Sequence, residues 1–114
     1  MTSSSAFNCQ SQQLAGERWV LRLSGELDLF AAPGFQRECR EILQGGCTEL
    51  FVDLGDLQFI DSAGLASLLI LYRESLNRNC SLVLVDELGR QERLFALTHL
   101  ESILPLHRTA AYQS

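Results

Sequence analysis

Two short apolar runs flank a long segment of helical periodicity, and this alternation limits the fold of the chain more than any other feature. The runs are ELFVDL (49–54) and CSLVLVD (80–86), which are typical of buried strands. Between them, residues 63–77 carry apolar side chains at helical spacing. A strand, a helix and a second strand in this order predict two parallel strands joined by a crossover helix.

The segments before this unit add two strands and a helix. Apart from Val20, residues 18–24 alternate between apolar and polar side chains and predict a strand, and residues 6–13 are its expected antiparallel partner. Residues 28–46 predict a helix, because Pro33 suits its first turn and the glycine pair 45–46 suits its end. Antiparallel pairing of the first two strands places residues 6–13 at one edge of the sheet.

The segments after the unit predict one more helix and a short strand. A helix is expected across residues 89–100, and an edge strand around 103–106, where Pro105 is tolerated only at an edge or a strand end. Residues 55–60 are expected to form a link between strand and helix. The helices are expected to face the sheet through Phe35, Cys39, Ile42 and Leu43; Leu65, Leu68, Leu69, Tyr72 and Leu76; and Leu94, Phe95 and Leu97. The predicted fold class is α/β: a single domain with a mostly parallel, mixed sheet of four to five strands, an antiparallel N-terminal edge strand and helices packed on the sheet.

Length and charge restrict the classes of function. With 114 residues the chain suits one domain, which we expect to span residues 6–108, between a disordered N-terminus (1–5) and a C-terminal tail (109–114). The net charge of −5 and the scattered basic residues argue against nucleic-acid binding. No secretory signal or membrane-spanning run is visible, so a cytoplasmic protein without membrane insertion is expected.

The cysteines predict neither a metal site nor a disulfide framework. Cys9, Cys39, Cys47 and Cys80 lie far apart, with no C-x-x-C pair and no histidine at metal-ligand spacing. We therefore expect reduced thiols, some of them buried as small apolar side chains, and no metal.

One polar junction interrupts the most hydrophobic part of the chain, in FIDSAGLASLL (59–69). Ser62 suits the N-cap of the following helix, Asp61 would add favourable charge at the positive end of that helix, and Gly64 would permit a close approach of backbone. Asp28 follows an earlier strand, and the carboxyl ends of parallel strands are where ligands and partners tend to meet such a sheet. A helix N-terminus also accommodates an anion such as a phosphate on Ser62.

Two separated blocks carry a resemblance to a known family. The segment SGELDLFAAPGFQRECREIL (24–43), followed by LFVDLGDLQFIDSAGLASLLILYRESL (50–76), resembles the STAS domain family, named for sulfate transporters and anti-sigma factor antagonists. The resemblance runs from about Phe7 to Leu106 and is greatest to the stand-alone bacterial anti-sigma factor antagonists.

The resemblance implies a phosphorylation switch that works without catalysis by this chain. It makes Ser62 the phosphorylated residue and implies partner binding through Asp28, Leu29, Asp61, Ser62, Ala63, Gly64 and Leu65. The unphosphorylated protein would bind an anti-sigma factor serine kinase and free a sigma factor, which places it in partner-switching regulation of transcription. The kinase would bring the ATP, so the chain needs no cofactor, and a serine phosphatase would reverse the step. The protein is expected to be a monomer or a weak dimer. It departs from many members of the family at Ala63, where they carry Ser or Thr.

Two other functions remain open from the sequence. The chain is a candidate partner subunit of a membrane transport ATPase, or a nucleotide-binding STAS module, because some domains of this family serve in those ways. A serine hydrolase is a remote alternative. Residues 60–64 read I-D-S-A-G and lack the first glycine of a nucleophile elbow, and no motif pairs an acid with His99 or His107.

Overall fold

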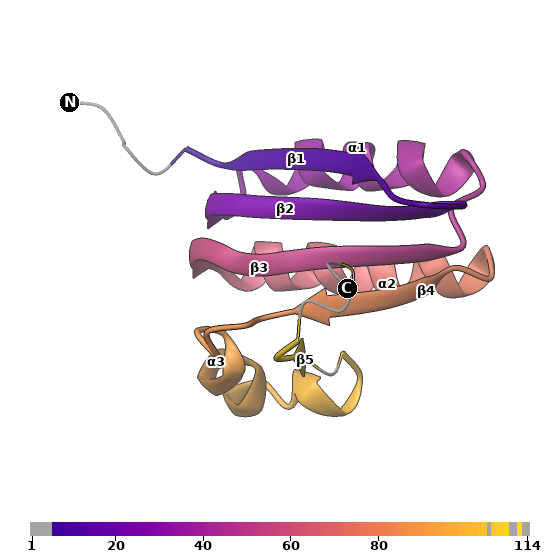
Figure 1. Cartoon of the computed structure of the whole chain (residues 1–114). Helices are drawn as coiled ribbons and strands as arrows, with labels where there is room; N and C mark the ends of the chain where they lie inside the picture. Colours follow the sequence, from indigo (N-terminus) through magenta and orange to yellow (C-terminus); the bar gives the residue numbers. More distant parts are fainter. Residues whose placement is uncertain (1–5, 105, 110–111, 113–114) are drawn as a thin grey trace.

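The structure is a computed structural model that describes residues 6–104, 106–109 and 112. The predictions for residues 1–5, for Pro105 and for residues 110–111 and 113–114 of the C-terminal tail lie outside this range. The elements follow the expected alternation of strands and helices (Figure 1): β1 (Asn8–Gln13), β2 (Arg18–Leu27), α1 (Ala32–Gln44), β3 (Glu49–Ile60), α2 (Ser62–Asn77), β4 (Ser81–Val85), α3 (Glu92–Leu97), the 3₁₀ turn η1 (Leu100–Ser102) and β5 (Leu106–His107).

The five strands form one mixed sheet in the order β1-β2-β3-β4-β5. β1 pairs antiparallel with β2, whereas β2, β3, β4 and β5 pair in parallel. The helices α1 and α2 cover one face of the sheet, and α3 lies beyond β4 (Figure 1). The predicted fold class, including the antiparallel strand at the N-terminal edge, is confirmed.

β3 extends further than the sequence predicts. Residues 55–60, expected as a link, continue the strand to Ile60 beside the last residues of β2. The pairing shifts register twice, between Arg22 and Ser24 and between Gly25 and Glu26. These irregularities leave Leu54, Leu57 and Ile60 buried at a spacing of three residues, so the period of two that identifies a strand is absent from the sequence.

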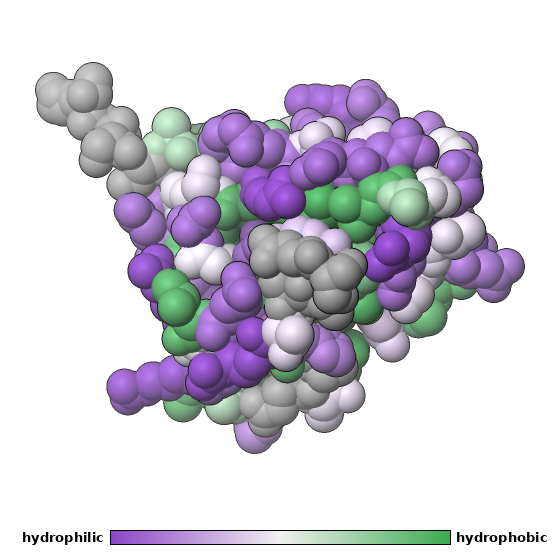
Figure 2. Space-filling model, in the orientation of Figure 1, coloured by the Kyte–Doolittle hydropathy of each residue, from purple (hydrophilic) through white to green (hydrophobic). Residues whose placement is uncertain are grey.

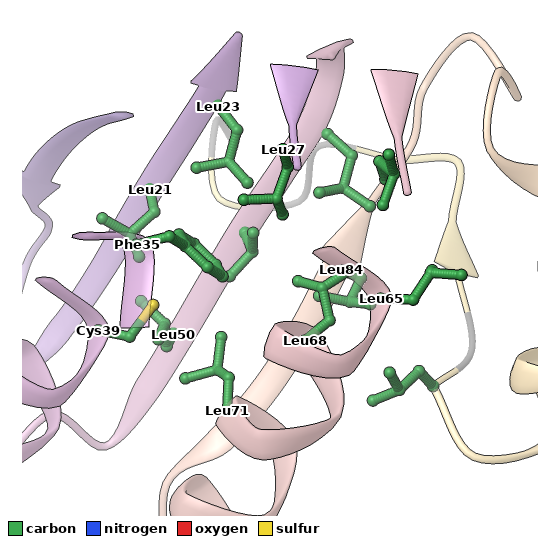
Figure 3. Packing of buried hydrophobic residues seen from close by; sticks show 14 of the residues in the cluster. Leu21, Leu23, Leu27, Phe35, Cys39, Leu50, Leu65, Leu68, Leu71 and Leu84 are labelled. Carbon is green, nitrogen blue, oxygen red and sulfur yellow. The ribbon is translucent and has the colours of Figure 1, made fainter. Parts of the chain in front are cut away.

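The main core lies between the sheet and the two long helices. Leu21, Leu23 and Leu50 of the sheet face Phe35 and Cys39 of α1 and Leu68 and Leu71 of α2 (Figure 3). The predicted apolar stripe of α1 is confirmed, because Phe35, Cys39, Ile42 and Leu43 are all buried.

Two predicted core positions are wrong. The buried face of α2 runs through Leu68, Leu71 and Ser75, whereas Leu76 is 57% exposed. This face is rotated from the predicted stripe, because small polar residues such as Ser75 share it and lower its apparent hydrophobicity. Leu97 is 69% exposed, since the six-residue α3 is anchored mainly by Phe95.

The second face of the sheet carries a small apolar cluster of its own. Val20, Phe51 and Val85 pack there against Tyr112, which accounts for Val20 breaking the alternation of β2. The Tyr112 hydroxyl donates a hydrogen bond to Asp53, and the Arg22 guanidinium lies 5.4 Å from the centre of the Tyr112 ring. Figure 2, which looks onto this face, shows hydrophobic residues as a band among hydrophilic ones.

The raised pKa of Tyr112 predicts that the protein loses stability in alkaline solution. Burial and the hydrogen bond to Asp53 raise its pKa from 10.0 to about 12, so the folded state favours the neutral phenol. The stabilisation is complete below pH 10.0 and is lost as the pH rises through about 12. Chemical denaturation of Tyr112→Phe and wild type across this range should show a steeper fall for wild type; parallel curves would contradict this account.

Candidate site at the carboxyl ends of β2 and β3

The carboxyl ends of two parallel strands bring the predicted residues together. Leu27 at the end of β2 is the register partner of Ile60 at the end of β3. Asp28 and Asp61 follow these two residues, and the Asp61 N–H donates to the Leu27 carbonyl at 3.3 Å. Two segments that are 33 residues apart in the sequence therefore meet at the end of the sheet where β2 and β3 finish.

The N-cap of α2 is Asp61, which corrects the sequence prediction of Ser62. Asp61 has extended backbone, and its Oδ1 accepts a hydrogen bond from the Gly64 N–H at 2.9 Å. Ser62 is the first residue of the helix and is exposed. The capping oxygen belongs to Asp61, so the Ser62 hydroxyl is not needed for the cap and faces solvent at the positive end of the helix.

The two carboxylates also hold the loop after β2. Asp61 Oδ2 accepts the Leu29 N–H at 3.1 Å, and so links that loop to α2. Asp28 Oδ1 accepts the N–H groups of Phe30 at 3.1 Å and Ala31 at 3.0 Å. Both carboxylates therefore stabilise the local structure as well as carrying charge, because they hold the loop after β2 in place.

Gly64 permits the close contact between α2 and the end of β2. A Cβ built at Gly64 would lie 2.2 Å from the Leu27 carbonyl oxygen and 2.9 Å from Cγ2 of Ile60. Gly64 and Leu65 are buried, and Ala63 is half-buried. These residues set the position of Ser62 from beneath the surface.

Apolar side chains are exposed next to Asp28 and Asp61 in the chain. Leu29 is 64% exposed, Phe30 89% and Phe59 48%, and each lies within two residues of Asp28 or Asp61. We call these three residues with Ser62 the Ser62 surface. The sequence pattern predicts a role for Leu29 but not for Phe30 or Phe59. The signal in the sequence is their position, because each phenylalanine lies two residues from one of the two aspartates.

Two substitutions of Asp61 should distinguish how much each of its hydrogen bonds, to Gly64 and to Leu29, contributes to stability. Asp61→Ala removes the cap and the bond to Leu29 and should lower the free energy of unfolding by about 2 kcal/mol. Asp61→Asn keeps an acceptor for Gly64 but loses the bond to Leu29 if its NH₂ group faces that amide, and should cost about 1 kcal/mol. Urea denaturation measures both values, and faster exchange of the Leu29 amide should accompany each variant. Equal stability of Asp61→Ala and wild type would show that the cap is unimportant.

Other groups of the described residues are placed away from this site. Cys9, Cys39, Cys47 and Cys80 are free, and burial raises the pKa of Cys9 and of Cys80 to about 12. Within the described residues, no three histidine, cysteine or acidic side chains gather as a metal site. None of the helices that the structure describes is long and apolar enough to cross a bilayer.

The remote hydrolase alternative requires a histidine beside Ser62. His99 instead follows α3 in left-handed conformation, and His107 lies in β5, beyond β4 from the strand that precedes Ser62. Among the hydrogen bonds of the described residues, none joins either imidazole to the Ser62 hydroxyl.

Known proteins share this sequence pattern and this fold. The family model described as "Mlab, STAS domain" matches residues 11–105. An anti-sigma-B factor antagonist of Staphylococcus aureus is 28% identical over 87 residues, which are 75% of this chain and 80% of that relative.

Two solved structures share the fold. The crystal structure of an anti-sigma factor antagonist from Mycobacterium paratuberculosis has a TM-score of 0.83 at 24% identity, covering 97% of this chain and 93% of that one. The Bacillus cell fate determinant SpoIIAA, solved in phosphorylated form, has a TM-score of 0.70 at 23% identity, covering 91% and 94%. From the family model and its extent, the chain belongs to the STAS domain family.

Proposed function

We propose that the protein is an anti-sigma factor antagonist whose binding to its partner is switched by phosphorylation of Ser62. The observation that carries the proposal is the exposure of Ser62 on the first turn of α2, beside a cap that does not need its hydroxyl. The similarity to the anti-sigma-B factor antagonist supports the class of partner. The proposed partner is an anti-sigma factor with serine kinase activity, and a serine phosphatase reverses the modification.

The fold tolerates phosphate at this position. The kinase transfers the terminal phosphoryl group of ATP to Ser62 Oγ, the hydroxyl proton leaves, and ADP remains. The product carries about −1.5 to −2 charges, which the free N–H groups and dipole of a helix N-terminus stabilise. Ser62 is exposed, so the added group requires no rearrangement of the core.

The same phosphate opposes binding. In the unphosphorylated protein, Leu29, Phe30 and Phe59 offer exposed apolar area, and Phe30 has the greatest exposure. Apolar and aromatic anchors of this kind contribute most when a partner removes them from water. A phosphate on Ser62, next to the carboxylate of Asp61, keeps this part of the surface hydrated and repels an acidic partner.

A comparison of captured proteins and modified peptides tests this proposal. Tagged wild type and Ser62→Ala are used as bait in extract of the native cell, with Ser81→Ala as the control, since Ser81 is an exposed serine at the far end of the sheet. Ser62→Ala should enrich an anti-sigma factor kinase, and phosphopeptide mass spectrometry should find phosphate on Ser62 in wild type and in Ser81→Ala. Loss of kinase capture in Ser62→Ala would mean that the hydroxyl is a binding contact.

The alternative is a partner subunit of a membrane transport ATPase, for which the same surface would serve without phosphorylation. The experiment above separates the two functions, because that alternative predicts capture of an ATPase by wild type and Ser62→Ala alike. It also predicts unmodified Ser62 in wild type and in Ser81→Ala.

A further inference from the structure

One edge of the sheet is long, regular and unpaired within the described residues. β1 lies at the outside of the sheet and pairs only with β2 (Figure 1). The opposite edge, β5, has only two residues and lies next to the segment that contains α3 and η1. Exposed edges are usually blunted by charged residues, proline or a bulge. β1 reads NCQSQQ, has none of these features and pairs with β2 without a register shift.

The hydrogen bonds of the hairpin identify which backbone groups point outward. The Leu14 N–H donates to the Arg18 carbonyl at 2.7 Å. In an antiparallel pair, successive residues direct their N–H and C=O groups alternately toward the partner and away from it. The even-numbered residues of β1 therefore bond to β2, and the outward groups belong to Cys9, Ser11 and Gln13.

These outward groups are arranged so that β1 complements a copy of itself. With Ser11 opposite Ser11 of a second copy, Cys9 lies opposite Gln13 and Gln13 opposite Cys9. All three outward residues then fall in hydrogen-bonded pairs. The same register sets Gln10 opposite Gln12 on the other face, where the amide nitrogen of Gln12 is free to donate, since its oxygen accepts from Arg22 at 2.9 Å.

Charge also favours a second copy over an unrelated strand. The chain carries a net charge of −5, yet β1 contributes no charge, so two copies meet there without repulsion between facing acids. Beside this edge, Arg37, Glu38 and Glu41 of α1 line the groove between α1 and β1, and Arg37 and Glu41 are exposed. Under two-fold symmetry the two helices run antiparallel, so each exposes both signs of charge to the other.

We infer that two copies of the chain associate through antiparallel pairing of β1, centred on Ser11, to form one continuous ten-stranded sheet. The interface is small, and the dimer is therefore weak, with a dissociation constant on the order of 10–100 µM. Ser62 follows β3, which β2 separates from β1 in the sheet, and it stays free in this dimer, so the inference does not depend on the proposed function.

Charge substitution at Ser11 tests the register. Sedimentation equilibrium should show wild type passing from monomer to dimer as its concentration rises. Ser11→Lys and Ser11→Glu each set like charges opposite one another, and each should associate about tenfold or more weakly than wild type. An equimolar mixture should form a heterodimer, because opposite charges then face each other. Gln44→Lys is the control for charge, since Gln44 is exposed at the end of α1.

The outcomes decide the inference in either direction. Restored association in the mixture supports it and excludes misfolding of the single variants. It is overturned if wild type stays monomeric to about 500 µM, well above the expected dissociation constant. Equal association of wild type, Ser11→Lys and Ser11→Glu also overturns it. If Ser11→Lys instead weakens capture of the anti-sigma factor kinase by a monomeric protein, the edge receives a strand of that partner.

Discussion

Gly64→Ala is expected to lower the free energy of unfolding by about 3 kcal/mol or more, because the new methyl group meets backbone. Its carbon would lie 2.2 Å from the Leu27 carbonyl oxygen, a distance that no side-chain rotation relieves. α2 must then move away from the end of β2, which strains the bonds of Asp61 to Gly64 and Leu29. Thermal unfolding should show a fall of roughly 10–20 °C for a domain of this size.

The matched control is Gly34→Ala in the other long helix. Gly34 and Gly64 are each the third residue of their helix, but a Cβ at Gly34 would meet only the Arg37 side chain, at 3.9 Å. Alanine is the better helix former, so Gly34→Ala should stabilise the protein by about 0.5–1 kcal/mol. Opposite signs for the two variants would show that the effect at Gly64 comes from the close contact. A small effect at Gly64 would contradict the geometry of the site.

Ser62→Glu is expected to weaken binding to the captured anti-sigma factor kinase by about tenfold or more, with little change in stability. The carboxylate lies in the first turn of α2, where the helix dipole favours negative charge, so the melting temperature should stay within a few degrees of wild type. Binding falls because the charge is added next to Asp61, which holds the loop that carries the exposed Leu29, and three residues after the exposed Phe59. Phosphoserine carries more charge than glutamate and should have the larger effect.

Titration calorimetry measures this effect against two controls. Gln44→Glu makes the same change in net charge at the far end of α1 and should bind as wild type does. Ser62→Ala should also bind as wild type does, since the Asp61 cap remains. Equal affinity of Ser62→Glu and Ser62→Ala would contradict switching by charge.

The sequence predicts the layout of this domain well, because its helices and central strands keep regular periods. The stripe from Phe35 to Leu43 and the run 80–86 follow the helical and strand rules, and both are placed correctly. The end of β3 was missed because the register shifts opposite it hide the period of two. The buried face of α2 was misplaced because Ser67 and Ser75 lie on it and bond to carbonyls of their own helix.

The sequence predicts that Asp28 and Asp61 lie at the carboxyl ends of strands, but only part of the detail around them. The junction at Asp61 and Ser62 stands out in the sequence as a polar break between apolar elements. The sequence does not tell which of two adjacent capping residues supplies the cap, since Asp and Ser are both common there. Nor does it reveal that Phe30 and Phe59 are exposed, because that depends on where the strands end in three dimensions.

The central claim is that Ser62 is a phosphate acceptor whose modification ends binding. The most direct measurement incubates the protein with the captured kinase and ATP, maps the phosphate by mass spectrometry and titrates the separated phosphoprotein against the same kinase. We predict one phosphoryl group on Ser62, none in Ser62→Ala, and loss of affinity in the modified protein. Phosphate at another residue, or undiminished affinity of protein modified at Ser62, would contradict the account.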